Sequence, residues 1–229
     1  MQRLKEPTKP HTGQITHIAY ALNGAVLVTG GGFGSGIKLT DVASGTTLWD
    51  ISDAQNSFPV EALAVSPDGR LLAAGGTSQS VLVWDIAAHR LMATCPQKVR
   101  FLHDVAFLPD GKLLAFADER GAIFLWDLSG QRPLRKLVGH AGPVNMLAFS
   151  PDGRTLASAS MDHTIRLWHP EIDQEVAILT GHSEWVWCVA FAEHGNVLLS
   201  GSRDGTLKLW QAASFDEIKA NERITSFNP

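Results

Sequence analysis

The stretch GHAGPVNMLAFSPDGRTLASASMDHTIRLWHP, residues 139–170, decides the fold because the rest of the chain repeats it. A second copy, GHSEWVWCVAFAEHGNVLLSGSRDGTLKLWQA, begins 42 residues later at Gly181. In the same frame the first turn closes on a glycine in each repeat: Gly24, Gly69, Gly111, Gly153 and Gly195. The last position of the frame is occupied in the five repeats by Thr40, Trp84, Trp126, Trp168 and Trp210. A period of this length indicates one supersecondary unit per repeat, each packed on its neighbours.

The turns and the residue types between them predict strands rather than helices. Pro-Asp-Gly occupies residues 67–69, 109–111 and 151–153, where proline suits the second turn position and glycine accepts a positive φ. The runs between turns are about eight residues long, rich in Val, Ile, Leu, Phe and Trp, and apolar on both faces. Short antiparallel strands stacked around an axis cover both faces. We therefore predict an all-β fold: a complete or partial β-propeller of five four-stranded antiparallel blades.

The repeat frame divides the chain into three parts. Residues 1–10 are polar and contain two prolines, which predicts at most a short edge strand at residues 3–5. The propeller is predicted at residues 11–211, with repeats at about 11–51, 56–95, 98–138, 140–180 and 182–211. In the tail, residues 212–229, Ser214 and Glu217 form a capping box, so a short helix is predicted after Ser214.

Composition predicts a soluble globular protein, with 229 residues of which 45% are hydrophobic and 18% charged. The formal net charge of -4 gives no specific signal for nucleic acid or an anionic membrane surface. No apolar run approaches the roughly 18 residues of a membrane span. Cys95 and Cys188 fall in apolar runs of different repeats, which predicts two reduced core thiols rather than a disulfide. We expect a cytoplasmic protein.

The Gly-His openings, the turn aspartates and the Trp-Asp closings at the 42-residue period resemble the WD-repeat β-propeller family. The Ser-Pro-Asp-Gly turns and the tail are similar to those of bacterial WD-repeat arrays. The resemblance covers residues 11–211, is most specific in repeats four and five, and is weakest in repeat one. It implies a structural relay of four hydrogen-bonded side chains in each of the last two repeats: His140, Ser158, Asp162 and Trp168, and then His182, Ser200, Asp204 and Trp210. The first three repeats lack the complete set, and we expect them to be less rigid.

A catalytic or metal-binding interpretation of these residues is less consistent with the repeat. His140, Ser158 and Asp162 are the residue types of a hydrolase triad. The same three types recur one period later, and two buried copies of one active site in adjacent blades would be implausible. His163 and His169 lie six residues apart, and no Cys or acidic cluster joins them at ligand spacing. We therefore predict no catalytic residue, no metal site and no cofactor.

The resemblance implies a non-enzymatic scaffold that binds a protein or peptide. Two alternatives stay open: a regulatory or sensor segment of a larger bacterial protein, for example one linked to a kinase, and an enzyme that uses residues of the central channel. The family commonly closes a ring of about seven blades, whereas this chain has five repeats. Either it forms a small ring or an open arc, or it associates with another chain or another copy to complete a ring, or it is part of a longer protein.

The candidate binding positions lie on the side of the His-bearing loops, where residues vary while the frame repeats. Repeat five gathers Trp185, Trp187, Glu184 and Arg203, and Trp and Arg are the types most enriched at binding hot spots. The alternative is that the tryptophans pack between blades, with Trp187 the more buried because it sits inside a strand. The equivalent positions in repeats two to four add Met161, Asn145, His103, Phe101, Glu119 and Glu61.

Overall fold

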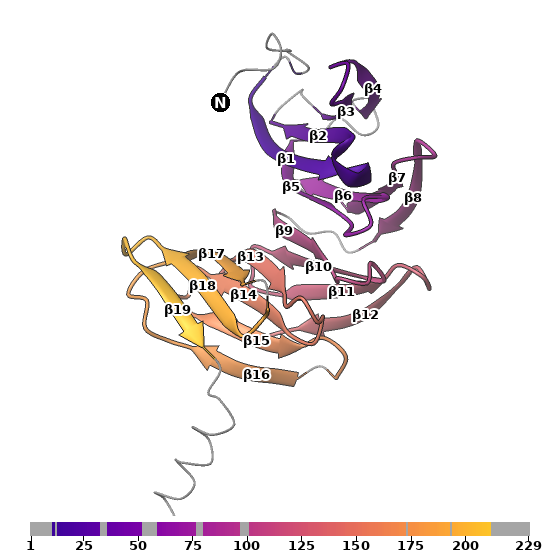
Figure 1. Cartoon of the computed structure of the whole chain (residues 1–229). Coiled ribbons are helices and arrows are strands. Elements are labelled where there is room, and N and C mark those ends of the chain that lie inside the picture. The colour runs from indigo at the N-terminus through magenta and orange to yellow at the C-terminus, as the bar shows by residue number, and fades with distance from the viewer. Residues whose placement is uncertain are drawn as a thin grey trace, which may run out of the picture.

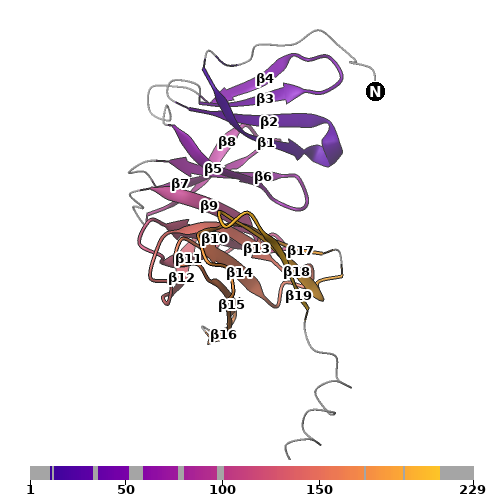
Figure 2. The same ribbon diagram turned by 90° about the vertical axis from the view of Figure 1, so that its left-hand side faces the viewer.

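The computed structural model of the chain describes residues 11, 13–32, 36–51, 59–76, 80–96, 101–172, 174–192 and 194–211. Within these residues the chain forms five antiparallel sheets, four with four strands and the last with three. Figure 1 shows these sheets, here called blades one to five, in chain order along an arc. Figure 2 shows the first three stacked one on the next. Blades one and five lie at opposite ends, so the ring is not closed.

The strands of each blade are hydrogen-bonded in chain order. Blade one comprises β1 (Ile15–Ala21), β2 (Val26–Gly31), β3 (Ile37–Asp41) and β4 (Thr47–Ile51), with a short 3₁₀ turn, η1 (Leu22–Gly24), after β1. Blade two comprises β5 (Val60–Val65), β6 (Leu71–Gly76), β7 (Val81–Asp85) and β8 (Arg90–Cys95). Blade three comprises β9 (Leu102–Phe107), β10 (Leu113–Asp118), β11 (Ile123–Asp127) and β12 (Arg132–Leu137).

Blades four and five continue the pattern toward the C-terminal end of the array. Blade four comprises β13 (Val144–Phe149), β14 (Leu156–Ser160), β15 (Ile165–His169) and β16 (Gln174–Leu179), and blade five comprises β17 (Val186–Phe191), β18 (Val197–Ser202) and β19 (Leu207–Gln211). The first strands of consecutive blades contact one another and form the inner side of the arc. The predicted all-β fold with five antiparallel blades is confirmed, but among the described residues blade five has three strands rather than the predicted four. The edge strand predicted at residues 3–5 and the helix predicted after Ser214 lie outside the described residues.

The tight turns that separate the first two strands of a blade have the geometry that the Pro-Asp-Gly motif predicts. In blade four, Asp152 Oδ1 accepts hydrogen bonds from Ser150 Oγ at 2.6 Å and from the backbone nitrogen of Arg154 at 3.0 Å. Gly153 closes the turn at φ 73°, and its amide donates to the Ser150 carbonyl at 2.8 Å. That left-handed backbone favours glycine, so the motif reverses the chain without strain.

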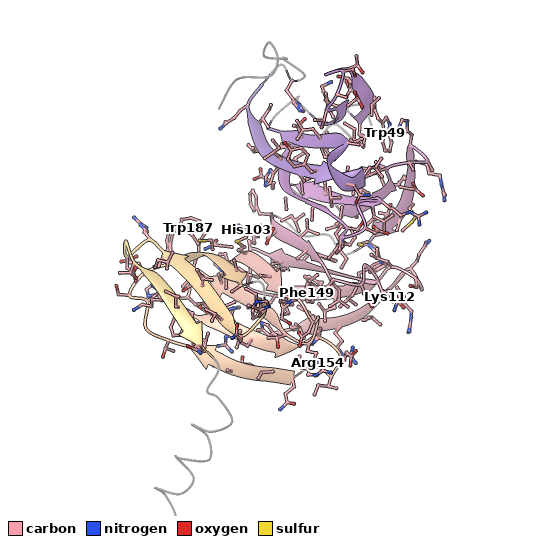
Figure 3. All side chains as sticks on the ribbon, in the orientation of Figure 1. Trp49, His103, Lys112, Phe149, Arg154 and Trp187 are labelled. Atoms are coloured by element: carbon pink, nitrogen blue, oxygen red, sulfur yellow. The ribbon has the colours of Figure 1, made fainter. Side chains whose placement is uncertain are left out.

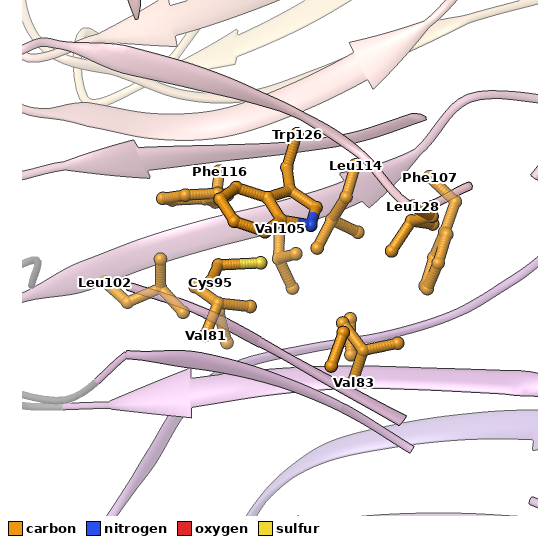
Figure 4. Packing of buried hydrophobic residues seen from close by; sticks show 13 residues of the cluster. Val81, Val83, Cys95, Leu102, Val105, Phe107, Leu114, Phe116, Trp126 and Leu128 are labelled. Carbon is orange, nitrogen blue, oxygen red and sulfur yellow. The ribbon is translucent and has the colours of Figure 1, made fainter. Parts of the chain in front are cut away.

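The hydrophobic core lies between blades rather than within one. Four clusters fill the four junctions between consecutive blades. Figure 4 shows the junction between blades two and three, where Val81 and Val83 of β7 face Val105, Leu114 and Phe116. Burying side chains of this size contributes roughly 1.5–3 kcal/mol each, so each blade depends on its neighbours.

The two cysteines differ in environment. Cys95 is buried at the junction between blades two and three, and burial raises the pKa of its thiol to about 12. The prediction that Cys188 is a core thiol is wrong, because this residue is exposed on a face of blade five that no further blade covers within the described residues. In the part of the chain that the structure describes, no helix is long and apolar enough to cross a membrane.

Candidate functional site

The candidate binding positions lie at one end of the blades, where each inner strand begins and each second strand ends. We call this end the loop face. The residue before the inner strand and the residue after the second strand meet across the loop: Met161 N donates to Pro143 O, and Arg203 N donates to Trp185 O, both at 2.9 Å. In Figure 3, His103 and Trp187 lie at this end, and Lys112 and Arg154 lie at the other. The exposed Phe101 immediately precedes β9 at the same end.

Blade five carries a compact aromatic and cationic group on the loop face. The rings of Trp185 and Trp187 meet edge to face, with centroids 5.7 Å apart and planes 79° apart. The guanidinium carbon of Arg203 lies 4.7 Å from the centroid of the Trp185 ring. A cation placed over an indole in this way contributes about 0.5–1 kcal/mol at an exposed site. We call these three residues the Trp-Arg cluster.

The two tryptophans differ in exposure, and the difference reverses the expectation from sequence. Trp187 is 47% exposed, whereas Trp185 is half-buried. The prediction that Trp187 is the more buried of the two is wrong, because Val186 and Val189 are the residues of β17 that pack against blade four. Trp187 falls between them and presents its ring to solvent.

The surroundings of the Trp-Arg cluster tie it to the framework. Glu184 is exposed, and its carbonyl accepts a hydrogen bond from Ser202 Oγ at 3.1 Å. Asn145 of blade four donates from Nδ2 to the Val186 carbonyl at 2.8 Å, next to Trp187. Asn145 Oδ1 is buried and has no partner among the described residues. Met161 is half-buried beside this junction.

Acidic residues and histidines of blades one to three lie close enough to interact, although the sequence does not show that they are neighbours. Burial lowers the pKa of His103, while the charges of Glu119, Glu61 and Asp118 act in the opposite direction. Burial likewise lowers the pKa of His17, opposed by Glu61. Among the described residues, no set of three or more His, Cys, Asp or Glu side chains is arranged to hold a metal ion. The loop face therefore has an acidic part in blades two and three and an aromatic part in blade five.

In blade four, the predicted relay residues form one continuous chain of hydrogen bonds. Trp168 Nε1 donates to Ser158 Oγ at 2.8 Å, and Ser158 Oγ lies 2.7 Å from His140 Nε2. His140 Nδ1 lies 2.7 Å from Asp162 Oδ2. Since an ionised carboxylate can only accept, the Nδ1 proton of His140 points to Asp162, and in a neutral imidazole Nε2 then accepts the proton of Ser158. Each group in the chain has the partner it needs.

Blade five repeats the same chain of hydrogen bonds. His182 lies 2.8 Å from both Ser200 Oγ and Asp204 Oδ2, and Trp210 donates to Ser200 at 2.9 Å. Among the described residues of blade one, His11 Nε2 lies 2.7 Å from Thr29 Oγ1, and Thr40 stands in the position of the tryptophan. In blade three, the Nε1 atom of Trp126 is buried without a partner among the described residues.

The burial and protonation of the relay are those of a structural network. Ser158 is completely buried, so a substrate could reach its hydroxyl only if the blade opened. Burial by itself would raise the pKa of Asp162, but the hydrogen bonds from His140 and Thr164 outweigh it and hold this pKa well below its usual value. In blade five, the hydrogen bond from Thr206 is the largest cause that lowers the pKa of Asp204, and His182 adds to it. Both carboxylates stay ionised as acceptors at the end of their relays.

Asp104 is a half-buried acid that sequence reasoning missed. It lies on β9, and its Oδ2 accepts a hydrogen bond from the backbone nitrogen of Leu147 on β13 at 2.7 Å. Burial raises its pKa to about 6, although the bonds from the Leu147 and Val105 amides oppose the shift. The only hint in the sequence comes from the repeat frame. Asp104 occupies a position at which blades two, four and five have the uncharged residues Ala62, Met146 and Cys188.

The family comparison agrees with this geometry. A family model described as "WD domain, G-beta repeat" matches residues 47–85, 131–169 and 173–211, which together make up just over half of the chain. The chain belongs to the WD40-repeat family. WD40 repeats generally mediate protein–protein interaction, and proteins built from them are typically non-enzymatic. A search of curated proteins finds no match to this chain.

Each matched WD40 unit spans two blades. The unit at residues 131–169 begins on β12, the outer strand of blade three, and ends with β15 of blade four. The unit at residues 47–85 runs in the same way from β4 to β7. A WD40 unit therefore links the outer strand of one blade to the first three strands of the next, and residues 86–130 form the same architecture between two matched units.

Proposed function

We propose that this chain is a non-enzymatic scaffold that holds a protein or peptide partner on its loop face, with the Trp-Arg cluster at the centre of the contact. The observation that carries the proposal is the exposed ring of Trp187, which packs edge to face against Trp185. The guanidinium of Arg203 lies over the Trp185 ring. Aromatic rings and arginine are the residues that most often dominate binding energy, and a ring that is already held in place loses little freedom on binding.

The neighbouring positions supply the rim of the proposed contact. Asn145 and Met161 lie on the blade-four side, and Glu184 lies beside the rings in blade five. In blades two and three, the carboxylates of Glu61 and Glu119 lie near His103, and their negative charges would attract basic residues of the same partner. The partner chemistry that fits is an extended peptide with an apolar residue for Trp187 and basic residues toward blade two.

A peptide library displayed on phage tests the proposal without a known partner. Peptides selected on the wild-type chain should share an apolar residue and basic residues, and their affinity should fall at least tenfold, about 1.4 kcal/mol, when Trp187 is replaced by alanine. The matched control is Val176→Ala, an exposed apolar residue on the outer strand β16, which should leave the affinity unchanged.

Thermal unfolding of the same variants separates binding from folding. Trp187→Ala should melt close to the wild-type temperature because its ring is half exposed. Peptides that bind the wild type and Trp187→Ala equally would contradict the proposal, as would a selection that enriches no peptide at all.

We also propose that the chain has no catalytic activity of its own and works in the cytoplasm. The two His-Ser-Asp sets are buried in relays, with Ser158 and Ser200 both accepting from a tryptophan. The free thiols of Cys95 and Cys188 suit a reducing compartment. Covalent labelling of Ser158 by a fluorophosphonate in the folded protein would contradict the first statement, and cell fractionation tests the second.

A further inference from the structure

Every junction between blades is built from the same two faces. The trailing face of a blade packs on the leading face of the next one. At the junction of blades four and five, the trailing face supplies Ala157, Ala159 and Ile165, and the leading face supplies Val186, Val189 and Leu198. The repeat frame places equivalent residues at the three earlier junctions.

The leading face of blade one has no blade to pack against within the described residues. Ile15, Ile18 and Tyr20 occupy the positions of Val186, Val189 and Phe191 in the frame. Ile18 is 67% exposed and Tyr20 is 65% exposed, whereas Val189 is almost completely buried. This is the apolar half of a blade junction, open to solvent.

The trailing face of blade five is open in the same way. Leu207 and Leu209 occupy the positions of Ile165 and Leu167, and they are 63% and 67% exposed, whereas Ile165 is completely buried. Cys188 is exposed on the same face. Contiguous apolar surface of this kind marks an interaction site more often than it marks solvent-facing surface.

We propose that the trailing face of blade five packs on the leading face of blade one of a second copy of this chain. The contact continues a junction that the chain already makes four times, with the same residue types at the same frame positions. Both halves are carried by one chain, so each copy meets its complementary face at the concentration of the protein itself. The association is head to tail, and each copy retains one open face until a ring closes or the assembly grows.

The proposed junction between two copies lacks an aromatic side chain that each internal junction has. Blades two to five each place a tryptophan on the leading face, Trp84, Trp126, Trp168 and Trp210, whereas blade one has Thr40 in that position. The contact therefore lacks the apolar area of an indole, and we expect it to form and dissociate with concentration rather than permanently. In the repeat frame Trp187 takes the position of Asn145, which bonds to the Val186 carbonyl of the next blade, so Trp187 would border the new junction.

Sedimentation velocity of the whole chain tests this proposal. From about 1 µM to about 200 µM the wild type should pass from monomer to dimer and larger species. Ile18→Glu blocks the leading face and Leu209→Glu blocks the trailing face, so each variant alone should remain monomeric at concentrations at which the wild type associates. Val176→Glu is the control on an exposed apolar position of β16, and it should associate like the wild type.

A mixture of the two blocked variants distinguishes head-to-tail contact from every other arrangement. The intact trailing face of Ile18→Glu should bind the intact leading face of Leu209→Glu, giving dimers and nothing larger. A mixture that stays monomeric overturns the proposal. Self-association that only one of the two substitutions abolishes also overturns it, because the contact would then join two leading faces or two trailing faces. A monomeric wild type whose Leu209→Glu variant melts much earlier also overturns it, because a segment of the same chain would then cover blade five.

Discussion

Asp104 shows how one side chain can make stability depend on pH. The carboxyl bridges β9 and β13 through its bond to Leu147 N, and its pKa of about 6 lies above the value of 3.8 for a free aspartate. Folding therefore favours the protonated acid. Below about pH 4 the group is protonated in both states, and the stability it contributes is lost as the pH rises through 6.

The Asp104→Asn variant isolates this effect because asparagine keeps an acceptor for Leu147 N and does not titrate. Between pH 4 and pH 7.5 the unfolding free energy of the wild type should fall relative to that of the variant by up to about 3 kcal/mol, the equivalent of about two pKa units. Urea unfolding at a series of pH values measures the difference. A constant difference across this range would show that Asp104 is solvated and titrates normally.

Within a blade, the relay joins the three inner strands at the loop face. His140 precedes β13, Ser158 lies on β14, and Trp168 lies on β15. Replacing His140 by alanine removes the imidazole acceptor of the buried Ser158 hydroxyl and one donor to the Asp162 carboxylate. Trp168 Nε1 still donates to the serine, and Ala141 N and Thr164 still donate to the carboxylate. The unfolding free energy should drop by about 1–3 kcal/mol, the usual cost of buried groups left unpaired.

The control for this prediction is His194→Ala, since His194 lies in the turn between β17 and β18 and is exposed. That substitution should change the unfolding free energy by less than about 0.5 kcal/mol. Equal losses in the two variants, measured by urea unfolding, would mean that the hydrogen bonds of the relay contribute nothing beyond the loss of a histidine.

The elements were predictable from sequence because their causes are local. The Pro-Asp-Gly turns and the 42-residue period indicate where strands start and stop, and the family resemblance implies that His140 and Trp168 belong to one network. Burial was less predictable because it depends on the neighbouring blade. Cys188 occupies the position of the half-buried Met146, but no sixth blade covers it within the described residues.

The loop face was predictable in its residues but not in its geometry. The repeat frame alone identifies the variable positions, including Trp185, Trp187 and Arg203. Which indole faces solvent depends on which residues of β17 turn toward blade four, and in a strand that is apolar on both faces the sequence does not show this. His103, Glu61 and Glu119 were predicted as separate binding positions, but not as one charged group with His17, because these residues come from three blades.

At the scale of the whole molecule, the five blades form an arc, and both of its end faces are apolar and exposed among the described residues. Each internal junction buries one trailing and one leading face, so the array gains a core only where two blades meet. Among the described residues, the terminal blades are each packed on one side alone. We expect them to open more readily than blades two to four, as the ends of other repeat arrays do.

A disulfide between the two ends tests whether the ring is open. At the junction of blades four and five, Met146 Sδ lies 3.5 Å from Val189 N. Cys188 occupies the Met146 position, and Ile18 occupies the Val189 position, so closure of the ring would bring residues 18 and 188 together. The variant Ile18→Cys supplies the second thiol, while Cys95 stays unreactive because it is buried and its pKa is about 12.

The measurement is oxidation of Ile18→Cys at about 0.1 µM, where encounters between copies are rare, followed by mass spectrometry of the non-reduced protein. An open arc predicts that the introduced thiol and Cys188 both remain free in the monomer, and that a bond between them forms only between copies when the concentration is raised. A monomer that forms the bond within one chain at high yield would contradict the open arc, because the two ends would then meet in a closed ring.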